Sequence, residues 1–166
     1  KKREHSYRRT TSKVLNALFN ILSNRVQGAR FLDLYAGVGT VGIEALLRGA
    51  SEAVFVEADR NRSAQIKKTL SERDLSSRAK VLNMKVETFL KNYSGEPFGI
   101  VFLDPPYHDF SPERVLSMLG PVTGINTLVV LEHFHKVTVP EESGGLRLKR
   151  QSRYGDTVLS FYEPEP

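Results

Sequence analysis

The chain has 166 residues, of which 40% are hydrophobic and 26% are charged, and it carries a formal net charge of +5. These values predict a single soluble domain over residues 1–166 with a buried core, and they exclude a wholly disordered chain. No apolar run approaches the roughly 20 residues of a membrane span, and the lack of cysteine excludes disulfides, thiol nucleophiles and cysteine-based zinc sites.

The chain begins with a polar, basic stretch, and we expect residues 1–12 to form a basic arm. A helix is predicted at about 13–24, because apolar residues recur there at helical spacing and Thr10 and Thr11 are candidate N-caps. The positive charge suits an anionic partner such as nucleic acid. A merely basic soluble protein explains the net charge equally well.

An apolar strand at 30–35 leads into a turn with Gly-x-Gly-x-x-Gly spacing, formed by Gly37, Gly39 and Gly42. Such a turn places free backbone N–H groups and the positive end of a helix dipole at the end of the strand, where a nucleotide-like ligand can bind. The spacing is a weak signal by itself. Its meaning depends on the residues at the ends of the later strands.

Further strands are predicted at 53–56, 79–82, 98–103 and 127–131, and they alternate with helices at about 60–73, 86–92 and 112–119. This alternation is typical of a doubly wound parallel sheet. The last two strands, at 146–149 and 157–162, predict an antiparallel hairpin, and residues 163–166 are expected to fray. The predicted fold is therefore α/β and Rossmann-like, with a mostly parallel seven-stranded sheet and a C-terminal antiparallel hairpin.

The second strand ends at Glu57, which follows Gly37 by 20 residues. A carboxylate at this spacing suits hydrogen bonds from the ribose hydroxyls of an adenosine ligand. A solvated charge at a strand end is the alternative. Up to this point NAD and S-adenosylmethionine (SAM) fit almost equally, because both carry an adenosine ribose.

The fourth strand is followed directly by Asp104, Pro105, Pro106 and Tyr107. Because the prolines hold the backbone out of a helix, we expect the Asp104 carboxylate and the Pro105 carbonyl to converge on one point, with the Tyr107 ring beside it. This arrangement suits a planar amine that donates two hydrogen bonds and stacks on the ring. A diproline turn with a packed tyrosine is the alternative, but together with Glu57 the tetrapeptide favours methyl transfer from SAM over hydride transfer with NAD.

The Asp-Pro-Pro-Tyr sequence resembles the motif of SAM-dependent amino-methyltransferases, and nearly the whole chain resembles the bacterial 16S ribosomal RNA guanine-N2 methyltransferases. The matching segments are Arg9–Thr11 leading into the first helix, Phe31–Gly37 with Gly39, Gly42 and Glu44, Arg48–Ala50, Val56–Glu57, Phe102–Tyr107 and Arg153–Thr157. The resemblance implies a class I SAM-dependent methyltransferase fold and methyl transfer to guanine N2 in ribosomal RNA, within an assembling small subunit or as free RNA. It also implies a monomer.

The resemblance implies catalytic roles for the Asp104–Tyr107 tetrapeptide. It implies cofactor contacts from Thr10, Thr11, Asp33, Tyr35, Ala36, Gly37, Gly39, Glu57, Asn83 and Asp104. Asn83 is included because the family often has Asp or Asn after the third strand, where this chain has Lys85, whose ammonium cannot accept a hydrogen bond from adenine. Helix capping explains the two threonines equally well.

Basic residues crowd the beginning of the chain and recur near its end. We expect RNA contacts from Arg8, Arg9, Lys13, Arg153 and Tyr154. For Tyr154, packing of the last hairpin is the alternative to stacking on a base.

No metal is expected, because SAM carries an already activated methyl group and because the pattern around His133 and His135 is typical of surface residues. We expect a cytoplasmic protein without a membrane partner, or an organellar one if a targeting segment has been removed. Other candidate functions are a DNA amino-methyltransferase, a protein-glutamine methyltransferase and a non-catalytic RNA-binding module. A dehydrogenase is disfavoured, because hydride transfer does not explain the Asp-Pro-Pro-Tyr sequence.

Overall fold

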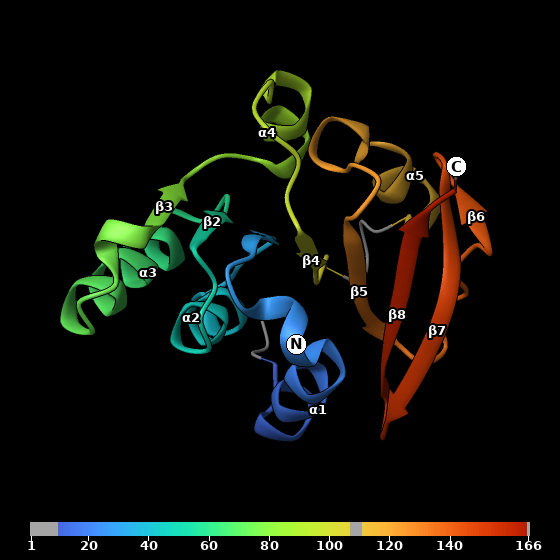
Figure 1. Cartoon of the computed structure of the whole chain (residues 1–166), viewed down its shortest axis with the longest axis horizontal. Helices are drawn as coiled ribbons and strands as arrows, with labels where there is room; N and C mark the ends of the chain where they lie inside the picture. Colours follow the sequence, from blue (N-terminus) through green and yellow to red (C-terminus); the bar gives the residue numbers. More distant parts are fainter. Residues whose placement is uncertain (1–9, 107–110, 166) are drawn as a thin grey trace, which may run out of the picture.

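A computed structural model describes residues 10–106 and 111–165 of the chain. The strands are β1 (Arg30–Leu34), β2 (Glu52–Val56), β3 (Ala79–Leu82), β4 (Ile100–Leu103), β5 (Leu128–Phe134), β6 (Glu142–Ser143), β7 (Leu146–Tyr154) and β8 (Thr157–Pro164). They form one sheet in the order β3-β2-β1-β4-β5-β8-β7-β6 (Figure 1). β1 to β5 pair in parallel, whereas β8 pairs antiparallel with both β5 and β7.

The predicted Rossmann-like α/β fold, with a mostly parallel sheet and a C-terminal antiparallel hairpin, is confirmed. The sheet has eight strands rather than seven, because β6 adds a two-residue pairing with Leu146 and Arg147 at the edge. A strand of two residues is too short to show an alternating pattern in the sequence.

The helices are α1 (Ser12–Leu22), α2 (Thr40–Leu47), α3 (Arg60–Glu72), α4 (Val86–Asn92) and α5 (Pro112–Ser117). In Figure 1, α1, α2 and α3 lie on one side of the parallel strands, and α4 and α5 lie on the other. Two buried clusters of apolar side chains match these two layers. All four residues of β4 are buried, as its unbroken apolar sequence predicts for a central strand. None of the described helices is long and apolar enough to cross a membrane.

Several predicted boundaries are corrected at the ends of elements. Residues 10–12, assigned to the arm, contain the N-cap of α1 and its first residue, and residues 1–9 lie outside the described part. The last strand continues to Pro164 because β7 pairs along it, and the Glu165 N–H donates to the Gly145 carbonyl at 2.8 Å. The tail expected to fray from residue 163 is therefore largely part of the sheet.

Candidate active site

A pocket lies at the carboxyl ends of β1 and β4, the neighbouring strands between which the strand order reverses. In open α/β sheets this reversal point is where ligands bind. The pocket is shallow and partly open to solvent. It is lined by Thr10, Asp33, Tyr35, Ala36, Thr40, Val41, Phe102 and Asp104. Five of these were predicted cofactor residues, while Thr40, Val41 and Phe102 were missed because nothing marks them among ordinary helix and strand residues.

The turn after β1 requires its glycines for conformation and for packing. Gly37 and Gly39 have φ angles of 64° and 84°, in the left-handed region that disfavours side chains. At Gly42 a side chain would collide with the Phe55 ring of β2. The turn can therefore bring α2 close to the sheet only with glycine at these positions.

Asp33 is 1% exposed and accepts a hydrogen bond from the Gly42 N–H at 2.9 Å. Burial raises the pKa of this carboxyl well above its usual value, and the nearby carboxylates of Glu57 and Glu132 raise it further, against the opposing effect of the Gly42 hydrogen bond. The pocket is thus lined by a buried acid in an already negative environment. A cation is the ligand charge that such an environment favours.

Glu57 is 6% exposed and binds two backbone amides. It accepts hydrogen bonds from Gly37 N and from Asp59 N, each at 2.7 Å, and Arg62 Nε lies 3.6 Å from the carboxylate. The Gly39 N–H likewise donates to the Ala36 carbonyl at 2.9 Å. The expectation that the turn has free amides is therefore wrong for both Gly37 and Gly39. The ribose contact of Glu57 stays a prediction.

Asn83 stabilises the loop between β2 and α3. Its side-chain amide donates to the carbonyls of Glu57 and Ala58, at 3.0 Å each. The nitrogen is thereby occupied, and the side-chain oxygen is the atom left to accept a hydrogen bond from an adenine amine. That adenine contact stays a prediction.

The two threonines before α1 have different structural positions. Thr11 is the N-cap of α1, and its hydroxyl accepts a hydrogen bond from Val14 N at 3.3 Å. Thr10 instead lines the pocket and donates to Glu132 Oε1 at 3.0 Å. Glu132 follows the apolar residues 128–131 within β5, and no sequence pattern predicts a role for it.

The Asp-Pro-Pro-Tyr tetrapeptide is described as far as Pro106. Asp104 is partly exposed and faces the pocket, Pro105 is buried and Pro106 is exposed. Tyr107 lies outside the described residues. Because β4 pairs with β1 so that Phe102 is opposite Asp33, both acids reach the same edge of the sheet.

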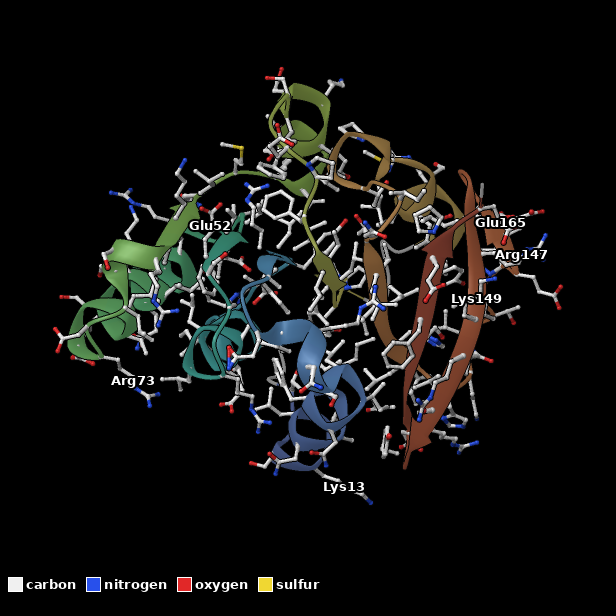
Figure 2. The ribbon with its side chains drawn as sticks, in the orientation of Figure 1. Lys13, Glu52, Arg73, Arg147, Lys149 and Glu165 are labelled. Atoms are coloured by element: carbon white, nitrogen blue, oxygen red, sulfur yellow. The ribbon has the colours of Figure 1, made fainter. Side chains whose placement is uncertain are left out.

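Three of the five predicted RNA-binding residues, Lys13, Arg153 and Tyr154, lie in the described part of the chain. Lys13 is exposed and points away from the start of α1, far from Arg147 and Lys149 on β7, which lie beside Glu165 (Figure 2). Arg153 is exposed and its Nε donates to the Gly155 carbonyl at 2.7 Å. Tyr154 is half-buried and packs against the core cluster on the α1 side of the sheet. Arg8 and Arg9 lie outside the described residues.

The expected surface position is wrong for His133. β5 extends past its predicted end, so this ring is 4% exposed and its Nε2 lies 2.7 Å from Ser160 Oγ. Its Nδ1 lies 3.0 Å from the Phe134 carbonyl, and burial lowers the pKa of the imidazole. Within residues 10–106 and 111–165 no cluster of three or more His, Cys, Asp or Glu side chains is arranged to hold a metal.

A family model described as conserved hypothetical protein 95 matches residues 2–163. Ribosomal RNA small subunit methyltransferase D of Escherichia coli (strain K12) is 32% identical over 160 residues, covering 95% of this chain and 80% of that protein. A conserved hypothetical protein of Streptococcus pyogenes has a solved structure with a TM-score of 0.84 and 32% identity, covering 92% of this chain and 96% of that chain. An RNA methyltransferase from Salinibacter ruber in complex with S-adenosyl-L-homocysteine has a TM-score of 0.72 at 16% identity, covering 95% of each chain, which shows a shared fold.

Proposed function

The chain belongs to the conserved hypothetical protein 95 family and is similar to ribosomal RNA small subunit methyltransferase D, and on this basis we propose that it is a SAM-dependent methyltransferase. In the proposed reaction, the methyl group of SAM is transferred to the exocyclic N2 amine of a guanine in small-subunit ribosomal RNA. The observation that carries this proposal is the position of Asp33 and Asp104 in one pocket at the reversal point of the sheet. We assign Asp33 to the cofactor and Asp104 to the acceptor amine, because Asp104 begins the motif that resembles the amine-binding motif of amino-methyltransferases.

The charge of the pocket supports SAM over a dinucleotide. Asp33, Glu57 and Glu132 are all buried, and Asp33 is close enough to the other two for their charges to raise its pKa. These carboxylates would repel the pyrophosphate of a dinucleotide, and the Gly37 N–H that could bind it is already bound to Glu57. A ligand with a sulfonium and an ammonium group is instead attracted to them.

When bound, SAM supplies a methyl group on a sulfonium that leaves as a neutral thioether. The task of the protein is to hold the acceptor amine in line with that group. Asp104 and the carbonyl of Pro105 accept hydrogen bonds from guanine N2, and each bond to the charged carboxylate contributes about 1.5–3 kcal/mol. These acceptors favour the positive charge that develops on nitrogen, and Asp104 takes the proton.

The remaining residues of the proposed site bind the ligands. Asp33 and Thr10 contact the methionine part of SAM, Glu57 contacts its ribose, and Tyr107 stacks on the guanine with a contribution of roughly 1–3 kcal/mol. A guanine in structured RNA must leave its stack to reach the pocket, which costs a few kcal/mol. Phosphate contacts from the basic residues offset that cost.

We also propose that the protein acts as a cytoplasmic monomer and that its RNA substrate is presented within the assembling small subunit. Ribosomal RNA of the small subunit is the substrate class given in the name of the Escherichia coli relative.

The test is to incubate the protein with radiolabelled SAM and, separately, small ribosomal subunits, free 16S RNA, DNA and total protein. Digestion to nucleosides should give labelled N2-methylguanosine from the subunit or its RNA. Label in adenine or cytosine of DNA would support the DNA amino-methyltransferase, and label in glutamine the protein methyltransferase. If the protein binds RNA without SAM and no arm becomes labelled, the result would support the non-catalytic RNA-binding module.

A further inference from the structure

The net positive charge of the chain is concentrated at the β3 edge of the sheet. Residues 60–85, from the start of α3 to the residue before α4, contain eight of the 24 Lys and Arg residues and two of the 19 Asp and Glu residues. The rest of the chain is almost neutral, with 16 basic and 17 acidic residues. In Figure 1 this segment lies at the end of the molecule opposite the β7–β8 hairpin.

The exposed face of α3 carries cations separated by small side chains. Arg60, Lys67 and Lys68 are exposed, and the other exposed residues on this face, Ala64 and Ser71, are small. The opposite face of the helix is buried against the sheet. A ligand can therefore approach the three cations without meeting a bulky neighbour.

These three cations differ from basic residues elsewhere on the surface. Within residues 10–106 and 111–165 no ion pair involves Arg60, Lys67 or Lys68. On β7, by contrast, Arg147 and Lys149 lie 2.7 Å from Glu142 and 3.5 Å from Glu165, respectively. The α3 face thus keeps its positive charge, which attracts a polyanion.

The α3 face begins beside the proposed cofactor site. Arg60 follows Asp59, whose N–H donates to the Glu57 carboxylate at 2.7 Å. At a rise of 1.5 Å per residue, Lys67 lies about 10 Å along the helix from Arg60. The cations therefore form a row rather than a cluster around one point, and a row of phosphates is the ligand that matches it.

The composition of this segment favours a nucleic acid duplex over a single strand or a protein. Residues 60–85 contain no Phe, Tyr or Trp, whereas single strands are bound largely by stacking on aromatic side chains. Protein interfaces need an apolar centre, but the large apolar side chains that are exposed in the described part of the chain, Leu47 and Ile125, lie outside α3. A duplex covers its own bases and presents phosphates and 2′-hydroxyls.

We propose that the exposed face of α3 is a docking surface for a double-stranded segment of the substrate RNA, whose phosphates Arg60, Lys67 and Lys68 bind. The inference rests on the proposed function and extends it. The protein binds an RNA helix beside the pocket while the target guanine, outside that helix, enters the pocket. This surface is separate from Arg153 on β7, because α3 and β7 lie at opposite ends of the sheet.

The first measurement is the affinity for an RNA duplex of about 20 base pairs, by fluorescence anisotropy at several salt concentrations and without SAM. Combining Lys67→Gln with Lys68→Gln should weaken binding by about tenfold and lower the slope of log affinity against log salt by about 0.9 for each phosphate no longer neutralised. Combining Lys67→Arg with Lys68→Arg keeps both charges and should bind within about twofold of the wild type. Unchanged affinity in the glutamine variant would overturn the proposal.

The matched control combines Arg147→Gln with Lys149→Gln, which removes two cations that are already paired with Glu142 and Glu165. Its duplex affinity should stay within about twofold of the wild type, and a loss equal to that of the α3 variant would show that net charge controls binding. Thermal unfolding of each variant identifies any that fails to fold. If the α3 double variant fails, Lys67→Gln and Lys68→Gln are measured singly.

Two further probes test the class of partner. A single-stranded RNA of the same length should lose less affinity than the duplex in the α3 variant, and an equal loss would overturn the duplex assignment. Polyglutamate at the same charge concentration should not displace the duplex from the wild type. If it does, the surface fits an acidic protein and the RNA assignment is wrong.

Methylation of small subunits tests the consequence for the reaction. The α3 glutamine variant should raise the KM for subunits by about tenfold, with kcat within about twofold of the wild type and unchanged affinity for SAM. A lower kcat with unchanged KM would overturn the docking role. If the wild type methylates no RNA, the proposed function fails, whereas the duplex measurements still decide whether α3 binds RNA.

Discussion

Gly37 donates its backbone N–H to the Glu57 carboxylate over 2.7 Å, and this bond joins the turn after β1 to the end of β2. The other carboxylate oxygen accepts from Asp59 N at the same distance. Glu57 therefore fixes both loops that border the proposed adenosine site. A ribose hydroxyl would add a hydrogen bond to a carboxylate that is already held in place, so the side chain is preorganised for the ligand.

The first prediction is that Glu57→Gln lowers the free energy of unfolding by about 1–3 kcal/mol. The amide would present an NH₂ group to one of the two backbone N–H donors, leaving a buried donor without an acceptor. Urea denaturation measures the loss. Glu57→Gln should also weaken SAM binding, and a variant with wild-type stability and wild-type affinity would contradict both roles.

The second prediction is that Asp33→Asn stabilises the protein while weakening SAM binding. Burial raises the pKa of Asp33 in the folded state, so the ionised form opposes folding as the pH rises above the ordinary value of 3.8. Asparagine keeps an oxygen for Gly42 N and removes the charge. The melting temperature at neutral pH should rise, whereas affinity for SAM should fall by about tenfold or more because a charge-assisted interaction is removed.

The control for Asp33→Asn is the pH dependence of its stabilising effect. The gain should shrink as the pH falls toward the range in which the wild-type Asp33 is protonated in both states. A gain that is the same at acid and neutral pH would show that the charge of Asp33 is not its cause.

The sequence predicts the layered α/β fold well, because helical and strand periods alternate over most of the chain and Gly37 and Gly39 mark the first turn. The predicted parallel strand order also places Asp33, in the first strand, and Asp104, after the fourth strand, at one edge of the sheet. Periodicity does not predict which backbone groups a buried carboxylate binds. The Gly37–Glu57 bond is therefore visible only in the structure.

Two errors share a physical cause. The extension of β5 to Phe134 and of β8 to Pro164 depends on antiparallel pairing between these late strands, which is a long-range interaction that local sequence does not encode. His133 is therefore buried rather than at the surface, and Glu163 and Pro164 belong to β8 rather than to a frayed end.

The third prediction concerns Asp104. Asp104→Ala should reduce methyl transfer by about a hundredfold or more at saturating SAM. The acceptor amine loses its charged hydrogen-bond partner, and the proton that leaves guanine N2 loses the carboxylate that accepts it. SAM affinity by calorimetry should change far less than turnover. Single-turnover assays with small subunits measure the rate, and wild-type turnover in Asp104→Ala would remove the proposed role.

The fourth prediction separates free basic residues from neutralised ones. Lys13→Gln and Arg153→Gln should weaken RNA binding and lower the slope of log affinity against log salt by about 0.7–0.9 for each phosphate that the variant no longer neutralises. Arg147 is the matched control, since its guanidinium already lies 2.7 Å from Glu142 and 3.2 Å from Glu165, at the β7 edge visible in Figure 2. Arg147→Gln should change the slope least, and an equal effect at all three positions would mean that general charge rather than these residues controls binding.

The fifth prediction is an acid-sensitive step in stability caused by His133. Its ring lies between Ser160 Oγ and the Phe134 carbonyl, and burial lowers its pKa below the ordinary 6.5. The unfolded chain therefore binds a proton at a higher pH than the folded chain does. Stability is fully present above about pH 6.5 and is lost as the pH falls from there toward the lowered folded pKa.

His133→Gln keeps hydrogen-bonding groups beside Ser160 and removes the titration, so its free energy of unfolding should change less over this pH window than that of the wild type. His135→Gln, two positions along the chain, should keep the step. Urea midpoints measured at intervals from about pH 7.5 to about pH 5 determine the two curves. If the wild type and His133→Gln lose stability in parallel, another group is responsible, because a neutral glutamine cannot take up the proton that drives the loss.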